Sequence, residues 1–346
     1  MRKTVYLLQP GVLGCREGAL CFAGDSLLEL ITLDDVEEVL IYGNVTVDKL
    51  LLDFCTEKQI ILHFFDYYGY YSGSYYPRLH HNSAFLILKQ AEHHTDREKR
   101  LFIAGQLVHG AVGNILHVLK YHHGLGDDVG YWLLEVEKLA ALIDNTRDVG
   151  GLRGIMESVR KAYYNSLDAM LGLPEFRFMS RSRQPPDNPL NALISFGNSL
   201  LYSQTLSEIY QTGLDPRIGF LHDQEFGRFN LHLDLAEVFK PLLVGRTIFV
   251  LLADRKALTI EDFMRTDGGV LLTDKGKQTF LEEWGERMAK TADIADSCEV
   301  TNRLLLKMEL AKMEQHLMGE NIYVPYVKDA DNQNDCLGQD SSLRSE

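Results

Sequence analysis

The sequence changes character once, near Pro77, and this change limits the fold more than any other feature. Before Pro77, short apolar runs alternate with turn residues, which is typical of an antiparallel β domain. After it, apolar residues recur at helical spacing and strand patterns almost vanish. We therefore predict an α+β protein, with a small N-terminal antiparallel β domain in residues 1–81 and a larger all-α-helical domain in residues 82–326.

Several segments carry specific helix signals. In the first domain, Val47, Leu50, Leu51 and Phe54 recur at i, i+3, i+4 and i+7, which predicts one amphipathic helix. In the second domain, an asparagine cap followed by proline at 188–189 predicts the start of a helix. We expect helices there over 82–124, 131–142, 190–211 and 300–318. Three further helices are expected with one end defined: one that contains residue 157 and ends near 170, one that begins at 244, and one that begins after 273. A hairpin is expected over 264–272.

The composition is that of an ordinary globular protein. Of its 346 residues, 45% are hydrophobic and 24% are charged. The N-terminus has no apolar signal core, and no run approaches 18 apolar residues, so we predict a cytoplasmic protein with no membrane partner. Five cysteines without a CxxC pair argue against a disulfide framework or a zinc knuckle. Residues 327–346 contain few apolar side chains and predict a flexible acidic tail.

Charge alone argues against a nucleic-acid partner, because the net charge is −14. The distribution weakens this argument. Residues 153–187 carry six basic residues against four acidic ones, so this part of the chain has a local positive charge. For the question of a nucleic-acid partner, we give the electrostatic field of this segment more weight than the net charge of the whole chain.

Two conspicuous patterns have ordinary interpretations. Histidine pairs occur at 80–81, 93–94 and 122–123. Adjacent residues on a helix point about 100° apart, so we interpret these pairs as surface histidines rather than metal ligands. The tyrosine-rich hairpin over 66–77 offers rings that stack on bases, but cross-strand aromatic packing or a subunit contact is the expected use.

Four residues are candidates for one chemical site. Asp234 and Glu237 are three residues apart, so on a helix both carboxylates share a face. His222 precedes Asp234 by twelve residues, and Glu157 lies on an earlier predicted helix. Oxygen ligands with one imidazole suit Mn²⁺ or Mg²⁺, and zinc is also compatible. Spacing alone leaves two other interpretations open, a proton-sharing pair and a solvated acidic helix face.

Three longer motifs in order resemble one known family. Residues 181–197 resemble the signature R-x-R-P-x-D-P-x-N-A-L-L-S-F-G, residues 219–222 match G-F-L-H, and residues 234–241 resemble D-L-M-E-E-F-R-P. These are motifs of the CRISPR-associated adaptation endonuclease and integrase family, Cas1. The resemblance extends to about residue 326 and is closest to the subtype I-B branch. The chain departs from the family at Ser158, usually glycine, and at Val238, usually acidic.

The resemblance implies both a site and a reaction. It implies Glu157, His222 and Glu237 as ligands of Mn²⁺ or Mg²⁺, with Asp234 as an additional catalytic acid, in the helical domain. The implied activity is metal-dependent DNA cleavage and integration, in which a 3′-hydroxyl attacks a phosphodiester to insert new spacers into CRISPR arrays for antiviral defence. The implied partners are double-stranded DNA with 3′ ends (prespacer and array), a second copy in a homodimer, the small ferredoxin-like protein Cas2 and, in some systems, an iron–sulfur adaptation nuclease.

Four basic residues are hypothesised to contact DNA phosphates: Arg160, Lys161, Arg181 and Arg183. The alternative is that they are solvated charges or ion-pair partners of nearby acids. Two other functions stay open at this point. One is an HD-type metal phosphohydrolase that uses His222 and Asp223. The other is a non-catalytic helical scaffold.

Overall fold

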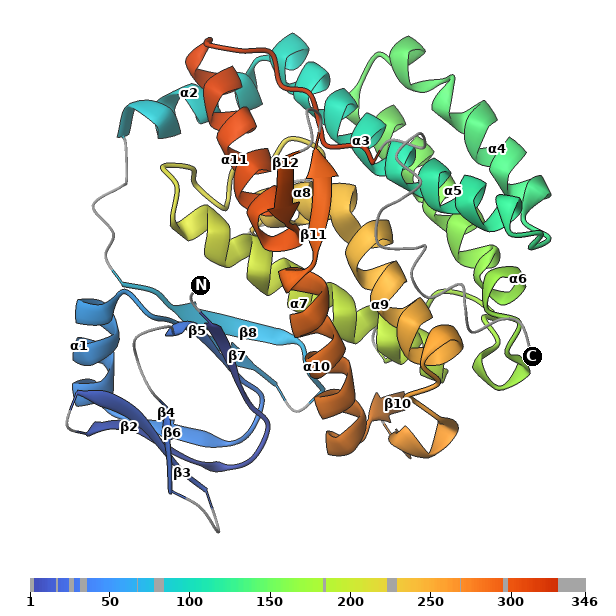
Figure 1. Ribbon diagram of the computed structural model, residues 1–346. Helices are drawn as coiled ribbons and strands as arrows, with labels where there is room; N and C mark the ends of the chain where they lie inside the picture. Colours follow the sequence, from blue (N-terminus) through green and yellow to red (C-terminus); the bar gives the residue numbers. More distant parts are fainter. Residues whose placement is uncertain are drawn as a thin grey trace. The chain divides into compact units, whose positions relative to one another are not determined.

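The computed structural model describes residues 3–16, 18–24, 28–31, 36–66, 68–77, 84–182, 185–222, 229–267, 269–294 and 298–328. It separates the chain into two units, Met1–Asn82 and Ser83–Glu346, each with its own internal contacts (Figure 1). The first unit consists mainly of strands and the second mainly of helices. This confirms the predicted α+β class with a β-sheet region followed by a mostly helical region.

The described part of the first unit forms two four-stranded sheets and one helix. One sheet has the order β1 (Lys3–Leu7), β5 (Val36–Ile41), β7 (Ile61–Phe65) and β8 (Tyr71–Tyr75). The other has the order β4 (Leu28–Ile31), β3 (Ala19–Gly24), β2 (Gly11–Arg16) and β6 (Val45–Val47). The sheets are mixed, because β1, β5 and β7 run parallel, as do β2 and β6. The predicted purely antiparallel pairing is therefore wrong.

The physical reason is that alternation identifies strands but not their partners. Parallel neighbours need a long crossover connection. The chain supplies two such connections, β2 to β4 between β1 and β5, and α1 (Lys49–Lys58) between β5 and β7.

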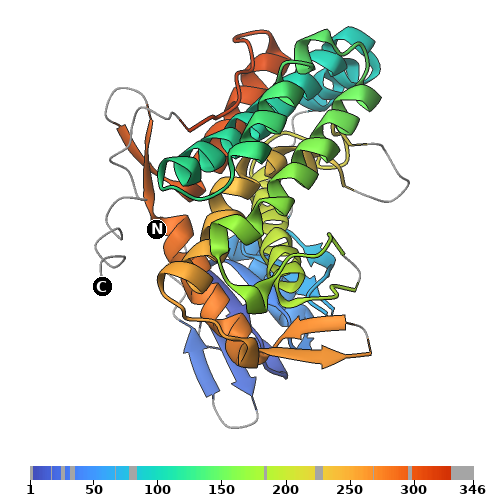
Figure 2. The same ribbon diagram turned by 90° about the vertical axis from the view of Figure 1, so that its right-hand side faces the viewer.

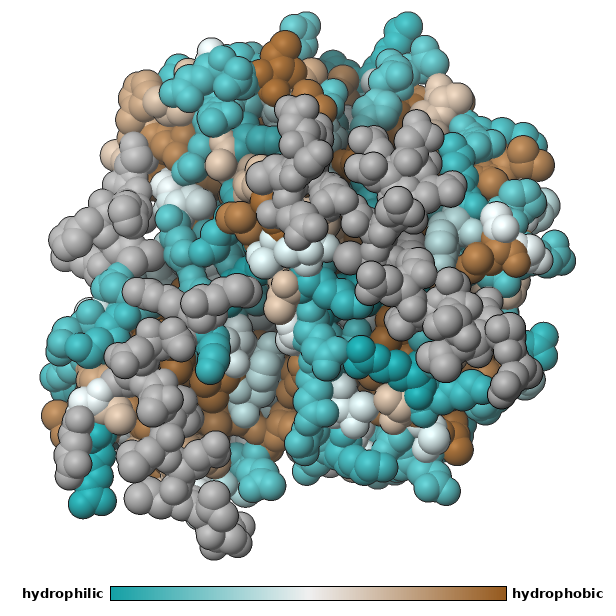
Figure 3. All heavy atoms as spheres, viewed as in Figure 1, coloured by the Kyte–Doolittle hydropathy of each residue, from teal (hydrophilic) through white to brown (hydrophobic). Residues whose placement is uncertain are grey.

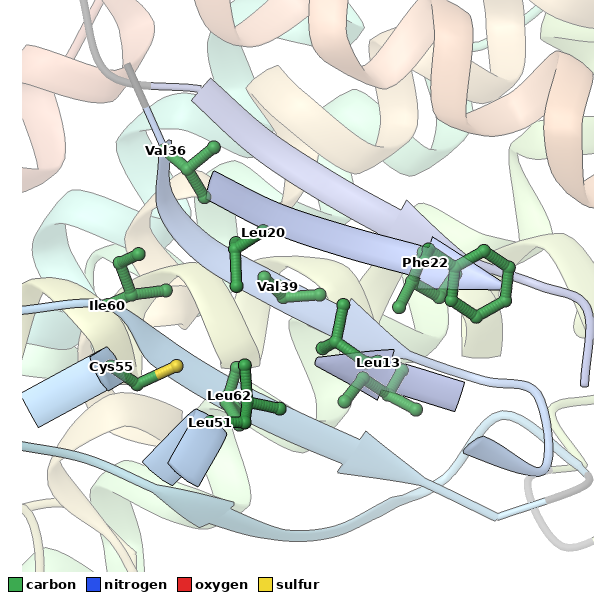
Figure 4. Packing of buried hydrophobic residues seen from close by; sticks show 11 residues of the cluster. Leu13, Leu20, Phe22, Val36, Val39, Leu51, Cys55, Ile60 and Leu62 are labelled. Carbon is green, nitrogen blue, oxygen red and sulfur yellow. The ribbon is translucent and has the colours of Figure 1, made fainter. Parts of the chain in front are cut away.

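The core of this unit joins both sheets to α1. Leu13 and Leu20 from one sheet meet Val39 and Leu62 from the other, and Leu51 closes the cluster from the helix (Figure 4). These five side chains are at most 3% exposed. The predicted helix is present as α1, but Val47 of the pattern ends β6 and Leu50 is 69% exposed, so the buried face rests on Leu51 and Phe54. The Asp48 side chain caps the helix by accepting from Leu51 N at 2.8 Å. Its apolar spacing and cap explain why this segment interrupts the strands.

The tyrosine-rich hairpin is used for packing inside the first unit. The Tyr71 ring meets Phe65 edge-on at 6.1 Å, and the two residues are partners in the β7–β8 register. The Tyr75 hydroxyl donates to Leu52 O at 3.0 Å. The expected cross-strand aromatic packing is confirmed for Tyr71, while Tyr75 packs against the core and bonds to α1.

The second unit is a helical bundle with two small hairpins. Its helices are α2 (Ala84–Thr95), α3 (Arg97–Gly124), α4 (Gly130–Ala140), α5 (Val149–Asn165), α6 (Leu167–Leu171), α7 (Pro189–Tyr210), α8 (Leu231–Lys240), α9 (Arg246–Phe249), α10 (Asp274–Ala289) and α11 (Asn302–Met318). The hairpins are β9 (Phe263–Thr266) with β10 (Gly269–Leu272), and β11 (Thr291–Ile294) with β12 (Cys298–Thr301). The first hairpin was predicted. The second was not, so the all-α description of this region is incomplete.

Helices α3 and α7 organise the bundle. Helix α3 lies beside α5 and α8 (Figures 1 and 2). It is long and apolar enough to cross a membrane by composition, but half of its apolar window is buried inside the protein, as in the core helix of a globular fold. Helix α7 is buried along nearly its whole length. Its start is as predicted, with Asn188 accepting from Asn191 N at 2.8 Å and Pro189 in the first turn.

Helix α8 continues further than the sequence predicted. Residues 231–254 form one uninterrupted helical run, in which π-helical turns at Pro241–Gly245 and Val250–Asp254 flank α9. The predicted separate helix from residue 244 is part of this run. A proline lacks the N–H of the regular ladder, and the wider π turn accommodates it.

Two surface assignments were wrong. His93 and His122 are buried, at 9% and 4% exposure. Each has a local partner, since His93 Nδ1 donates to Lys89 O at 2.8 Å and His122 Nδ1 lies 2.7 Å from Asp127. Elsewhere, hydrophilic residues cover much of the face shown in Figure 3, with scattered hydrophobic residues between them. The predicted acidic tail lies outside the described residues from position 329 onwards.

Candidate active site

A buried carboxylate at the start of α8 organises the site. Asp234 is fully buried and accepts four hydrogen bonds from the preceding loop. Its Oδ2 accepts from Phe220 N at 2.5 Å and Leu221 N at 3.0 Å. Its Oδ1 accepts from His222 N at 2.9 Å and His222 Nδ1 at 2.7 Å. The carboxylate therefore fixes both the loop backbone and the histidine ring.

The loop reaches Asp234 because residue 219 has no side chain. A Cβ on Gly219 would lie 2.7 Å from Asp234 Oδ2 and 2.7 Å from Asn230 Cβ. Both distances are shorter than any real Cβ contact. Only glycine allows the loop backbone to come this close to α8, because it has no Cβ. This explains the glycine at the start of the motif at 219–222.

His222 presents one ring nitrogen to the site. Because Nδ1 donates to Asp234, the neutral ring keeps its lone pair on Nε2. Nε2 lies 3.8 Å from Glu237 Oε1. The Asp234 carboxylate thereby favours the tautomer with its proton on Nδ1. In this tautomer Nε2 is available to bind a metal ion or to accept a proton.

Glu237 is a buried carboxylate with one satisfied and one unsatisfied oxygen. Oε1 accepts from Arg160 Nη1 at 3.0 Å and from Lys240 Nζ at 2.7 Å. Oε2 is buried and has no hydrogen-bond partner among the residues that the structure describes. Burial raises the pKa of this carboxyl, but the charges of Lys240, Arg160 and His222 outweigh it and lower the pKa to about 2. The group is thus ionised at neutral pH, with one oxygen that no described residue satisfies.

Glu157 joins these groups across a shared cavity. A cavity of about 360 Å³ is lined by residues of α5, the loop before α8, and α8 itself, namely Gly150, Arg153, Gly154, Met156, Glu157, Arg160, Leu221, His222 and Glu237. Glu157 is exposed, one helical turn before Arg160. The structure therefore brings Glu157, His222 and Glu237 to one cavity and places Asp234 behind His222.

The residue types fit a hard divalent ion. The vacant Oε2 of Glu237, the lone pair of His222 Nε2 and the Glu157 carboxylate are two kinds of donor that Mn²⁺ and Mg²⁺ accept. In the part of the chain that the structure describes, no three His, Cys, Asp or Glu side chains stand close enough together to enclose an ion. A complete ligand set therefore requires the Glu157 side chain to turn toward the other two.

The four predicted phosphate contacts have different positions. Arg160 lines the cavity, and Lys161 is exposed on the next position of α5. The Arg181 guanidinium holds the loop before α7, because it donates to Asn191 Oδ1 and Ser195 Oγ, each at 3.0 Å. For Arg181 the geometry favours a structural use. Arg183, like Asp223 of the phosphohydrolase alternative, lies outside the described residues.

The two departures from the family pattern leave the cavity unchanged. The Ser158 hydroxyl donates to Gly154 O at 3.0 Å on the exposed side of α5. Val238 is fully buried, and a Cβ on Gly110 of α3 would lie 3.3 Å from it. Neither position lines the cavity, so neither removes a candidate ligand.

Sequence reasoning missed the residues that hold the loop from the other side. Gln90 Nε2 donates to Asp215 O at 3.0 Å and Ile218 O at 2.7 Å. His94 Nδ1 donates to Gly219 O at 2.6 Å, and Arg100 Nε donates to Phe220 O at 3.0 Å. These partners are more than a hundred residues apart in sequence, and no local pattern marks them. Lys240 was also missed, although its three-residue spacing from Glu237 suggested an ion pair.

Comparisons with known proteins identify the family of this chain. A family model described as CRISPR associated protein Cas1 matches residues 5–286. A CRISPR-associated endonuclease Cas1 from Thermodesulfovibrio yellowstonii is 43% identical over 328 residues, which cover 94% of this chain and 99% of that protein. A second from Thermotoga maritima is 38% identical over 322 residues, covering 93% and 98%.

Solved structures give the same result. A Cas1 protein structure from Thermotoga maritima, 37% identical, superimposes with a TM-score of 0.84 and covers 94% of this chain and 100% of that one. A casposase bound to its integration product is 17% identical with a TM-score of 0.85, covering 95% and 94%. At that identity the second likeness shows a shared fold.

Proposed function

This chain belongs to the Cas1 family of CRISPR-associated proteins, and from that premise we propose that it is a divalent-metal-dependent DNA endonuclease and integrase that inserts spacers into CRISPR arrays. Its near-full-length relatives are named CRISPR-associated endonucleases. The observation that supports the metal-dependent reaction is the buried Oε2 of Glu237, which no described residue satisfies, on the same residue whose Oε1 lies 3.8 Å from Nε2 of His222. The assignment to subtype I-B stays a prediction.

Three residues would hold the ion: Glu157, His222 through Nε2, and Glu237 through Oε2. Bound Mn²⁺ or Mg²⁺ would neutralise the charge that gathers on the nonbridging phosphate oxygens and lower the pKa of the attacking hydroxyl. Asp234 acts through His222, since it holds the ring in the required tautomer. Lys240 stays with Oε1 of Glu237 and keeps the carboxylate ionised.

The nucleophile decides between two outcomes at the same phosphorus. When water attacks, its oxygen bonds to phosphorus, one bridging P–O bond breaks, and the strand is cut. When a DNA 3′-hydroxyl attacks, the new P–O bond joins the incoming strand, and the target strand leaves through its own 3′ oxygen. Each reaction releases the proton of the attacking hydroxyl and returns one to the leaving oxygen, and neither needs an oxidant or reductant.

Binding and assembly complete the proposal. Arg160 lines the cavity and Lys161 is exposed at the next position of α5, and in this proposal both contact phosphates of double-stranded DNA with 3′ ends. A solved Cas6-RT-Cas1–Cas2 complex contains a chain of the same fold, 19% identical with a TM-score of 0.81. We extend that association to this chain, as a homodimer that joins Cas2. An iron–sulfur adaptation nuclease is a further proposed partner.

The test compares ligand variants with the unmodified protein. We expect Glu157→Ala, His222→Ala and Glu237→Gln each to reduce Mn²⁺-dependent cleavage and strand transfer by roughly a hundredfold or more, and to weaken Mn²⁺ binding in calorimetry. Glu282→Ala, an exposed glutamate on α10, is the matched control and is expected to change neither. Undiminished cleavage in both Glu157→Ala and His222→Ala would show that this site is wrong.

A further inference from the structure

One face of α5 forms a wall of the cavity and contains two glycines. Gly150, Gly154, Glu157 and Arg160 follow one another at three- or four-residue spacing, and all line the cavity of about 360 Å³, as does Arg153 beside Gly154. Residues at this spacing share one side of a helix. Gly150, Gly154 and Glu157 are exposed, so solvent reaches the cavity along this side.

Packing against other described residues does not explain the glycines on this face. Glycine in a helix costs about 1 kcal/mol relative to alanine. A neighbouring glycine, Gly151, has a packing reason, because its Cβ would lie 2.6 Å from Thr146 Cγ2. A Cβ on Gly154 would meet nothing within 4 Å. On Gly150 it would meet only Asp148 Oδ1 at 3.2 Å and Arg153 Nη2 at 3.9 Å.

A helical glycine with free space beside it is not by itself a binding site. Gly285 on α10 is an example, since a Cβ there would also meet no described atom within 4 Å. The second observation is the carboxylate at the end of this face. Glu237 is 2% exposed, lines the same cavity, and has a buried Oε2 without a partner. This oxygen, which no described residue satisfies, is where the proposed function places the ion, so the strand that reacts must come to this end of the face.

The charges on the wall indicate the class of that ligand. Arg153 and Arg160 alternate with the two open positions and with Glu157. Guanidinium groups bind phosphates well, and the two glycines leave room for a nucleic-acid backbone to come close to the helix. Together they favour a nucleic-acid strand as the ligand. An acidic peptide would use the same guanidinium groups, but the proposed function supplies a phosphodiester strand, which must reach Glu157 and Glu237, and supplies no peptide.

We propose that Gly150 and Gly154 form the floor over which a phosphodiester strand enters the cavity, and that Arg153 binds a phosphate of that strand. This inference rests on the proposed function and specifies how its substrate is held. The strand crosses α5 at the two glycines, and the reacting phosphate lies between Glu157 and Glu237. A side chain at position 154 then blocks the strand but leaves the donors of the ion untouched.

The experiment separates strand binding from ion binding in the full chain. Gly154→Leu is expected to raise the Kd for 3′-ended DNA at least roughly tenfold, with Mn²⁺ affinity within about twofold of the unmodified protein by calorimetry. Gly154→Ala is expected to give a smaller effect in the same direction. Because leucine and alanine are better helix formers than glycine and the Cβ meets open space, both variants are expected to melt at or above the original temperature.

Matched controls test the two parts of the inference. Gly285→Leu makes the same change at an open helical glycine outside this cavity and is expected to leave DNA binding unchanged. Arg153→Gln is expected to reduce the slope of log Kd against log salt by about one unit of charge. Arg177→Gln, a 74% exposed arginine that pairs with Asp168, is expected to leave that slope unchanged.

The outcomes distinguish this inference from the proposed function. If Gly154→Leu binds and cleaves DNA like the unmodified protein, the strand path is wrong while the proposed function stands. If Gly154→Leu weakens Mn²⁺ binding as much as DNA binding, the cavity serves the ion alone and the inference is also wrong. If the unmodified protein neither binds Mn²⁺ nor cleaves DNA, the proposed function fails first.

Discussion

At the scale of single residues, Asp234 acts as a positioning group. Its carboxylate accepts four hydrogen bonds from described residues, all within 220–222. We expect Asp234→Asn to lower the free energy of unfolding by roughly 2–4 kcal/mol, because an amide places N–H donors against donors of the loop. We expect Mn²⁺ affinity to fall roughly 10–100-fold. Calorimetry measures the affinity, and ¹⁵N spectra of the His222 ring report its tautomer.

A buried carboxylate elsewhere provides the control. Asp262 is 3% exposed, and its Oδ2 accepts from Thr259 N at 2.9 Å. Asp262→Asn is expected to destabilise the fold but to leave the His222 tautomer and Mn²⁺ affinity unchanged. An Asp234→Asn variant with unchanged tautomer and affinity would refute the positioning role.

Glu237 gives the site a defined acid sensitivity. Its pKa of about 2 lies below the ordinary value of 4.5. The charged form therefore contributes stability that is complete above about pH 4.5 and is lost as the pH falls towards 2, an effect of about 3 kcal/mol. We expect the difference in unfolding free energy between the unmodified protein and Glu237→Gln to shrink over this range. Urea unfolding between about pH 7 and 3 measures it, and a constant difference would contradict the assignment.

At the scale of elements, local signals predicted helices well. The cap and proline before α7, and the apolar spacing of α1, are properties of a few neighbouring residues. Strand pairing is not local, so the parallel order of β1, β5 and β7 was missed. The π-helical continuation after Pro241 was missed because a proline ordinarily ends a helix.

In the candidate site, too, the features that local motifs determine were predicted and those that depend on distant contacts were not. The motifs identified Glu157, His222 and Glu237, which the fold brings to one cavity. The motifs did not identify how the loop is held. His94 belongs to a pair interpreted as surface histidines, yet it donates to Gly219 O from a helix 125 residues away. Such partners depend on the packing of α2 and α3 against the loop, which one sequence does not encode in a local pattern.

At the scale of the whole chain, the last described residues close the helical unit behind the site. Residues 320–328, here called the C-terminal strap, cross α3, α8 and α11. Asn114 Nδ2 on α3 donates to both Val238 O and Tyr326 O, at 2.8 and 3.0 Å. The Tyr323 hydroxyl, fully buried, donates to Glu309 Oε1 at 2.6 Å. The strap thus supports α8 on the side away from Glu237.

Truncation tests this support. Removal of residues 320–346 deletes two packed tyrosines and leaves Asn114 and Glu309 without strap partners. Burying an aromatic side chain is worth about 3–5 kcal/mol, and whole domains have only about 5–15 kcal/mol of stability. We therefore expect this truncation to abolish cooperative unfolding and Mn²⁺ binding together. Removal of 329–346 keeps every contact of the strap described above and is expected to unfold like the full chain, as circular dichroism would show. Equal unfolding of the two truncations would mean that α8 is held by α3 and α7 alone.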